Sequence, residues 1–481
     1  MRPLQVPMFT PETEWIPPTH LPDLKDHKEI AIDLETRDPG LKHSGSGSVN
    51  GNGEVVGIAV AVEGWSGYFP IAHEGGGNMD RALVLDWFEE VLHTDATKIF
   101  HNAMYDVSWI RSMGFYIRGG IIDTLIAASL IDENRWGYAL NALGKQYVGM
   151  GKNEKILTDA AKAWGVDPKA EMWRLPAPLV GEYAEQDAVV TLKLWHALQH
   201  EISKQDLWDV FNLETNLFPC LIDMKFKGVR VDVEQANILK QELIKEEKDI
   251  YQGIHKLVGF DVEIWAAASI AKAFDAVKLP YDRTEKGAPS FTKNFLATHP
   301  HELPKAIAHA REINKAHTTF IDTIIKHEHN GRIHADINQI RSDDGGTVTG
   351  RFSYSNPNLQ QIPARNKDLG PKIRALFIPE KNHTWGCFDY SQQEPRIVVH
   401  FASLLKLEGS QTIVDQYHAG EADFHQMIAD MAGIERKQAK TINLGLMYGM
   451  GKNKLMAELG LLKQAAEDLI RTYHQKAPFV K

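Results

Sequence analysis

The sequence predicts a multidomain protein: an α/β domain first, then a mainly helical region, then a mixed α+β region. Residues 1–200 alternate short β-branched runs with helical patterns, and residues 201–330 carry long amphipathic stretches. From Arg332 onward the chain is richer in turn residues and in Arg. At roughly 150 residues per domain, a chain of 481 residues corresponds to about three domains.

The elements of the first domain follow from hydrophobic periodicity. Strands are predicted at residues 29–33, 54–62, 66–71 and 98–100, and helices at 79–92, 105–113, 124–130 and 178–200. Glycine, serine and asparagine dominate residues 39–53, which predicts a flexible hairpin loop between the first two strands. Six prolines in residues 1–27 predict an irregular, loosely held N-terminal arm.

The second region is predicted to contain long helices at residues 233–253 and 304–327, with a turn into a short strand at 228–232. We therefore place domain boundaries at 28–203, 204–335 and 336–481. The two cysteines, Cys220 and Cys387, lie far apart, which excludes a disulfide framework and favours a reducing cytoplasm. There is no signal peptide and no apolar run of about 18 residues, so we expect no membrane contact.

The net charge of −10 argues at first against nucleic acid as a partner, because affinity for phosphate comes mainly from Lys and Arg. The acidity is local, however. Residues 1–200 hold 17 basic and 27 acidic residues, whereas residues 201–481 hold 36 of each. An acidic region that handles a polyanion would need bound cations.

Asp33 and Glu35 lie at the end of the first predicted strand. Side chains two positions apart on a strand point to one face, about 6 to 7 Å apart along the chain. Like charges at this spacing repel unless a positive group lies between them, and a divalent metal is a common one. Taken alone, the pair is more typical of a solvated strand end than of a metal site.

Two further motifs decide between these interpretations. Asn102 and Asp106 follow a short apolar strand, and Tyr183 and Asp187 share one face of a predicted helix. The ordered patterns D-x-E, N-x-x-x-D and Y-x-x-x-D resemble the DEDD family of 3′–5′ exonucleases in its tyrosine subclass.

This resemblance implies an RNase H-like fold for residues 28–203 and two-metal hydrolysis of a 3′-terminal phosphodiester, with Mg²⁺ or Mn²⁺ as cofactor. Asp33, Glu35, Asp106 and Asp187 would bind the metals. Tyr183 would assist the attacking water, and Asn102 would contact the single-stranded 3′ end of DNA.

A second constellation lies near residue 440. Arg436, Lys440, Leu444 and Tyr448 recur every four positions and form one stripe on a helix. Such a stripe suits a nucleoside triphosphate, although a solvated cationic helix end fits the spacing as well. Upstream, residues 384–389 predict a strand that ends at Asp389, followed by a capping box formed by Ser391 and Glu394.

These segments resemble family A DNA polymerases. Residues 389–396 match D-Y-S-Q-x-E-x-R, known as motif A, and residues 347–363 match T-x-T-G-R-x-S-x-x-x-P-N-L-Q-x-I-P. Residues 436–449 follow motif B, R-x-x-x-K-x-x-N-[FY]-G-x-x-Y-G, except at Leu444, where the family has Phe or Tyr.

The family resemblance implies that residues 204–335 are mainly thumb and that residues 336–481 are partial palm and fingers. It implies in-line transfer of dNTPs to a primer–template, with two metals per active site. Asp389 would bind the catalytic metals, and Glu394 would act as a gate against ribose. The other implied nucleotide-binding residues are Gln392, His425, Arg436, Lys440, Leu444 and Tyr448. The implied DNA-binding residues are Arg351, Asn358, Gln360 and Arg365.

No His-Asp-Glu triplet, the family's motif C, occurs in the sequence. We therefore expect the chain to stop inside the fingers and to need a complementary polymerase fragment that carries motif C, as in a split polymerase or an interrupted reading frame. Complete exonuclease motifs without a preceding 5′-nuclease domain resemble phage replicative enzymes, which act in the host cytoplasm. The alternative is a standalone 3′–5′ exonuclease or DNA-binding fragment without synthesis.

Overall fold

The computed structural model describes residues 7, 10–151, 154–343, 345–364 and 366–480. The chain forms two compact units, residues 1–383 and 384–481. Among the described residues, no helix is long and apolar enough to cross a membrane.

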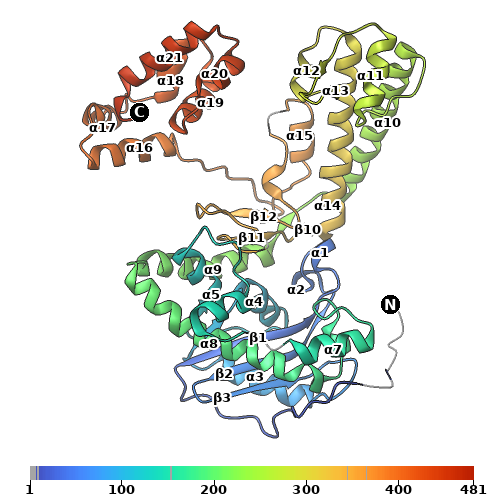
Figure 1. Cartoon of the computed structure of the whole chain (residues 1–481), viewed down its shortest axis with the longest axis vertical. Helices are drawn as coiled ribbons and strands as arrows, with labels where there is room; N and C mark the ends of the chain where they lie inside the picture. Colours follow the sequence, from blue (N-terminus) through green and yellow to red (C-terminus); the bar gives the residue numbers. More distant parts are fainter. Residues whose placement is uncertain (1–6, 8–9, 152–153, 344, 365, 481) are drawn as a thin grey trace. The chain divides into compact units, whose positions relative to one another are not determined.

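The first unit is built around a five-stranded sheet of order β3-β2-β1-β4-β5 (Figure 1). Its strands are β1 (Glu29–Arg37), β2 (Glu54–Val62), β3 (Trp65–Pro70), β4 (Thr97–Phe100) and β5 (Ile121–Asp123). The first three strands are antiparallel to one another, whereas β4 is parallel to both β1 and β5. All four predicted strands are confirmed, while β5 was not predicted.

The alternation of β1 sends its side chains into two different cores. Ile30 and Ile32 pack with helices α3 (Arg81–Leu92) and α4 (Ala103–Ser112) on one face. Ala31 belongs to the opposite core, together with helices α5 (Thr124–Ile131) and α8 (Gly181–Lys204). By the same alternation, Asp33 and Glu35 face α8, which lies across β1, β2 and β3 (Figure 1).

The four helices predicted in this domain are confirmed within a few residues at each end. Other helices of this domain include α6 (Leu140–Leu143) and α7 (Lys155–Trp164).

Residues 39–53 join the antiparallel strands β1 and β2 as the predicted hairpin connection, but the prediction that this connection is an irregular, flexible loop is wrong. This segment contains two short helices, α1 (Leu41–Ser44) and α2 (Gly47–Asn50). Asp38 accepts a hydrogen bond from the Gly47 N–H at 3.0 Å, and the Ser46 side chain caps α2. A Cβ atom at Gly47 or at Gly53 would lie 2.9 Å from the Trp109 ring, so these glycines are needed for packing rather than for flexibility.

The N-terminal arm, residues 10–27, has no helix or strand, as predicted. It is nevertheless held in place. The Trp87 indole donates a hydrogen bond to the Pro22 carbonyl at 2.7 Å, and Trp15 packs against the core beneath α8.

Residues 204–383 extend this unit with long helices. Helix α9 (Trp208–Lys227) leads through β6 (Val229–Arg230) into α10 (Val233–Val258), which packs along α13 (Glu302–Lys315) (Figure 1). A π-helical turn at Ala316–Ile321 joins α13 to α14 (Asp322–His327). The remaining elements are α11 (Ala267–Ala276), β7 (Asp282–Arg283), β8 (Pro289–Ser290), α12 (Lys293–Thr298), β9 (Glu328–His329), β10 (Arg332–Ile333), β11 (Asp336–Asn338), β12 (Ser353–Ser355) and α15 (Leu369–Arg374).

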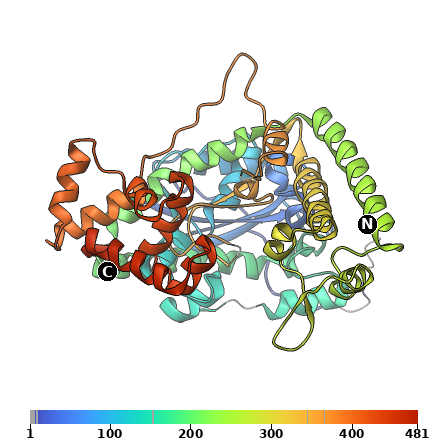
Figure 2. The same ribbon diagram turned by 90° about the horizontal axis from the view of Figure 1, so that it is seen from above.

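The second unit is helical. Its helices are α16 (Gln393–Leu404), α17 (Ser410–His418), α18 (Phe424–Ala432), α19 (Arg436–Met447), α20 (Lys452–Leu459) and α21 (Lys463–Lys476). The strand predicted at residues 384–389 is absent, because this segment is irregular and exposed (Figure 2). No described strand pairs with it, and a β-strand needs a partner for its ladder hydrogen bonds.

Candidate functional site

Three carboxylates converge between β1 and α8. Ligand atoms of Asp33, Glu35 and Asp187 all lie within 4.8 Å of one another. The strand alternation directs the first two side chains toward α8, and the helix supplies the third from its buried face. The structure thus brings together residues that are more than 150 positions apart.

The fourth predicted carboxylate, Asp106, is not one of the three that converge, but it is bonded to the strand residue between Asp33 and Glu35. Asp106 is buried in the first turn of α4, and its Oδ1 accepts a hydrogen bond from the Leu34 N–H at 3.0 Å. Burial raises the pKa of Asp106 well above its ordinary value, and the nearby charge of Asp33 raises it further.

This donor set fits divalent metal ions. Glu35, Asp106 and Asp187 are buried, and buried carboxylates are costly without a compensating positive charge. All four ligands are oxygen atoms, which Mg²⁺ and Mn²⁺ prefer over nitrogen or sulfur.

Tyr183 lies one helical turn before Asp187 on α8. Burial raises the pKa of its hydroxyl far above the ordinary value, and the charges of Asp187 and Glu35 add to this effect. The hydroxyl is therefore protonated at neutral pH and can donate a hydrogen bond beside the carboxylates.

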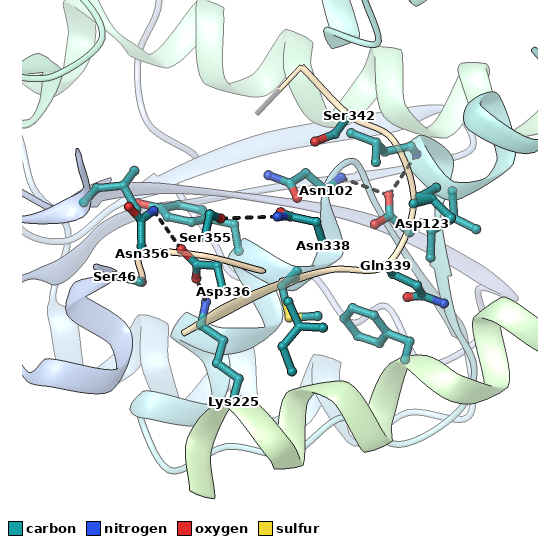
Figure 3. Close-up of a pocket in the computed structure, with 18 of the residues that line it drawn as sticks. Ser46, Asn102, Asp123, Lys225, Asp336, Asn338, Gln339, Ser342, Ser355 and Asn356 are labelled. Atoms are coloured by element: carbon teal, nitrogen blue, oxygen red, sulfur yellow. Dashed lines mark hydrogen bonds and ion pairs between the residues drawn. The ribbon is translucent and has the colours of Figure 1, made fainter. Parts of the chain in front are cut away.

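Asn102 begins α4 in the left-handed conformation, with φ of 69°. Asp123 occupies the amino end of this helix, since its two carboxylate oxygens accept hydrogen bonds from the N–H groups of Asn102 and Ala103 at 2.9 and 2.8 Å. Burial raises the pKa of Asp123 to about 6. This arrangement leaves the Asn102 side chain facing a cavity (Figure 3).

The cavity has a volume of about 570 Å³ and lies between the sheet domain and the β11–β12 hairpin (Figure 3). Its lining contains an ion pair between the buried Lys225 and the partly buried Asp336, in which Lys225 Nζ lies 2.9 Å from Asp336 Oδ1. Asn356 also donates a hydrogen bond to Asp336, at 3.0 Å. Amides, hydroxyls and apolar side chains form most of the rest, including Asn102, Met104, Leu125, Ile126, Phe218, Ile337, Asn338, Gln339, Ile340, Ser342 and Ser355.

In the second unit, the predicted nucleotide stripe lies on the outward face of α19. Arg436, Lys440 and Tyr448 are exposed and Leu444 is half-buried, whereas Ala439 and Ile442 pack into the core. The carboxylate of Asp423 accepts from the Arg436 guanidinium at 2.8 and 2.9 Å.

His425 is buried beneath this stripe. Its Nδ1 lies 3.0 Å from the Asn443 amide, which in turn accepts a hydrogen bond from the Tyr473 hydroxyl at 3.1 Å. Burial lowers the pKa of His425, which disfavours the imidazolium form.

The capping box predicted at Ser391 is wrong. Helix α16 begins at Gln393 without a side-chain cap, and Gln392 stands before it in the left-handed conformation. The Gln392 Oε1 accepts from Tyr417 and from the Phe424 N–H instead. Glu394 accepts a hydrogen bond from the Tyr448 hydroxyl at 3.4 Å. Asp389 lies in the exposed irregular segment.

The predicted DNA contacts in the first unit lie near β12. Arg351, Asn358 and Gln360 are all exposed, and Gln360 donates a hydrogen bond to the Phe352 carbonyl at 3.0 Å. Arg365 lies outside the described residues.

Comparison with known proteins places these features in a family. The sequence profile described as DNA polymerase family A matches residues 233–481, and the profile described as 3′-5′ exonuclease matches residues 13–203. The DNA-directed DNA polymerase of Pseudomonas phage M6 is 37% identical over 95% of this chain and 73% of its own length. The chain belongs to DNA polymerase family A.

This family A polymerase also resembles DNA polymerase DpoZ of Acinetobacter phage SH-Ab 15497, with 33% identity over 78% of the chain and 65% of the relative. DNA polymerase I of Pseudomonas aeruginosa is 29% identical over 96% of the chain and 50% of the relative. The POL domain of Pol1 from M. smegmatis, solved with DNA primer-template and dNTP, has the same fold. It aligns with a TM-score of 0.72 at 20% identity, over 95% of this chain and 74% of that one.

Several residues of the polymerase's first unit were not predicted from sequence. Asp123 had a usable signal, because an Asp directly before an apolar helical run is a typical N-cap. Lys225 and Asp336 had no signal in the sequence, because the two residues of this ion pair are more than 100 positions apart.

Proposed function

We propose that the chain removes nucleotides one at a time from the 3′ end of single-stranded DNA. The observation that carries this proposal is the convergence of Asp33, Glu35 and Asp187 within 4.8 Å, beside the hydrogen bond that ties the buried Asp106 to Leu34. These four carboxylates would hold two Mg²⁺ or Mn²⁺ ions. When bound, the ions supply the positive charge that activates water and stabilises the leaving oxygen.

The residues around the carboxylates have separate roles in this proposal. Tyr183 orients the attacking water with its protonated hydroxyl, because its pKa lies far above neutral pH. Leu34 fixes the Asp106 carboxylate through its backbone N–H, so that the ligand from α4 keeps its place relative to those on β1. The domain as a whole is the RNase H-like exonuclease that its sheet order supports.

The cavity beside Asn102 is the proposed site for the unpaired 3′ end. Two lysines line the cavity, Lys42 and Lys225, and Asp336 neutralises Lys225. The part of the cavity around this ion pair therefore suits a neutral nucleobase. The lining includes Met104 and Tyr105 of α4, the helix that carries Asp106, together with Ser355 and Asn356. The latter two residues lie two to five positions before Asn358 and Gln360, the proposed primer contacts.

For synthesis, we propose that Arg436 and Lys440 bind the triphosphate, that Tyr448 and Glu394 select the nucleotide, and that Asp389 binds the catalytic metals. Among the described residues, Asp389 belongs to no cluster of three metal-ligating side chains. The palm therefore requires a further carboxylate from a segment or partner that carries motif C.

The exposed surface of the second unit supports this requirement. Phe388 and Tyr390 are 97% and 80% exposed, and α16 presents Phe401 and Leu404 to solvent. Aromatic and aliphatic side chains of this size are ordinarily buried. Palm strands from the motif C segment would pair with residues 384–389 and cover these side chains.

Degradation and extension of a 5′-labelled primer–template in Mg²⁺ test both parts. We expect degradation by this chain alone, and extension only when a polypeptide carrying motif C is added. Degradation with no extension under either condition would favour the alternative function, a standalone exonuclease.

A further inference from the structure

The N-terminal arm lies over the helix that carries two of the exonuclease residues. Residues 10–14 of the arm line a common pocket with Pro176 and Leu179, which belong to the segment leading into α8. Further along the arm, Pro18 lies against Gly67 of β3. The arm thus touches both the start of α8 and the neighbouring sheet edge.

Trp15 makes the closest of these contacts. A Cβ atom built on Gly181, the first residue of α8, would lie 2.3 Å from the Trp15 ring. No side chain at position 181 fits beneath the indole, so the ring sits directly on the helix backbone. The ring also lies 5.9 Å from that of Tyr68 on β3.

The polar edge of Trp15 is held as well. Its indole N–H donates a hydrogen bond to Glu185 Oε2 at 3.0 Å, and the Ser66 hydroxyl donates to the other oxygen, Oε1, at 2.6 Å. Glu185 stands between Tyr183 and Asp187 on the same helix. The carboxylate of Glu185 therefore connects the arm, the helix and the sheet.

Helix α8 has no side-chain cap at its amino end, because Val180, the residue before the helix, provides none. The Trp15 ring packs on this end of the helix, at Gly181. Asp187 lies only six residues after Gly181, so a shift of the first turn would displace it from Asp33 and Glu35.

We infer that Trp15 is a positioning residue for the exonuclease metal site, which it acts on through Gly181 and Glu185. The inference rests on the proposed nuclease function for the identity of that site. Trp15 touches no reacting group, and its role is to set the depth and rotation of α8 against the sheet.

The affinity of the whole chain for Mn²⁺, measured by calorimetry without DNA, tests this inference. Trp15→Ala should weaken Mn²⁺ binding roughly tenfold, as loss of an outer-shell partner does. Trp15→Phe, which keeps the ring on Gly181, should recover most of the affinity. Ile16→Ala is the matched control, because this neighbouring side chain is 73% exposed.

Gly181→Ala gives a second, independent test. An alanine inside a helix ordinarily stabilises it relative to glycine. Here the new methyl group would displace the Trp15 ring, so we expect weaker Mn²⁺ binding. In the double variant with Trp15→Ala, the loss of Mn²⁺ affinity should be no greater than in either single variant, because the two substitutions disrupt the same contact.

The outcomes separate the inference from the proposed function. Equal Mn²⁺ affinity in wild type and Trp15→Ala, or a change only in melting temperature, would overturn the positioning role while leaving the nuclease intact. A wild type that binds Mn²⁺ and follows the expected series, but degrades no DNA, would overturn the nuclease alone. A wild type that binds no Mn²⁺ would remove both.

Discussion

The Leu34 N–H donates a hydrogen bond to Asp106 Oδ1 over 3.0 Å, and this bond ties the metal-ligating end of α4 to the strand that carries Asp33 and Glu35. An asparagine at position 106 would keep the acceptor oxygen but lose the charge. Asp106→Asn should therefore retain the fold, judged by circular dichroism, and lose exonuclease activity by more than about 100-fold. Full activity in this variant would exclude Asp106 as a metal ligand.

Tyr183→Phe removes the protonated hydroxyl beside Asp187 and little else. We expect kcat for single-stranded DNA to fall roughly 100-fold, the usual cost of losing one positioned donor, with KM nearly unchanged. Tyr116→Phe is the control, because Tyr116 is a 66% exposed tyrosine of the same domain. A rise in KM without a fall in kcat would place Tyr183 in DNA binding instead.

The ion pair between Lys225 and Asp336 predicts an asymmetric pair of variants. Lys225 is 3% exposed and Asp336 is 21% exposed, so an orphaned ammonium is costlier than an orphaned carboxylate. Asp336→Asn should lower the free energy of unfolding by about 3 to 5 kcal/mol and Lys225→Met by less. Denaturant titration of both variants and of the double variant measures this. Equal losses of unfolding free energy in the two single variants would contradict the claim that the unpaired Lys225 ammonium is costlier than the unpaired Asp336 carboxylate.

His73 predicts a pH dependence of stability. Its ring is buried between the Tyr68 hydroxyl, 2.6 Å from Nε2, and the Leu175 carbonyl, 3.0 Å from Nδ1. Burial lowers the pKa of His73 from 6.5 to about 4. The unfolded chain therefore binds a proton near pH 6.5 that the folded chain binds only near pH 4, and stability falls as the pH drops through this window.

The expected loss between pH 6.5 and 4 is about 3 kcal/mol from this one group. Thermal unfolding of wild type and of His73→Gln across this pH range isolates the contribution of His73 to stability. The other titrating groups, Asp123 included, are common to both proteins. Parallel pH profiles for the two proteins would show that His73 is not held neutral.

Leu444 occupies the position where the family has Phe or Tyr, on the outward stripe of α19. We expect Leu444→Phe to change the ratio of dideoxynucleotide to deoxynucleotide incorporation, measured with the motif C polypeptide present. Equal ratios in wild type and variant would remove Leu444 from nucleotide selection.

The sequence predicted those features that depend on local periodicity. The alternation of β1 placed Asp33 and Glu35 on one face, and the four-residue spacing placed Tyr183 with Asp187. Prediction from the sequence failed where contacts between distant residues override local preference. Residues 39–53 are glycine-rich, yet Asp38 and Trp109 hold them as two short helices. Residues 384–389 have a strand-like pattern, yet they remain irregular because no described strand pairs with them. Nothing local to Trp15 indicates that it lies on Gly181.

The central claim is that the carboxylates on β1, α4 and α8 form a metal-dependent 3′–5′ exonuclease site. A 5′-labelled single-stranded oligonucleotide incubated with the whole chain in Mg²⁺ tests it most directly. The account predicts a ladder of products shortened one nucleotide at a time from the 3′ end, abolished by chelation and by Asp33→Ala. Undegraded DNA with the wild type, or an unchanged ladder with Asp33→Ala, would contradict it.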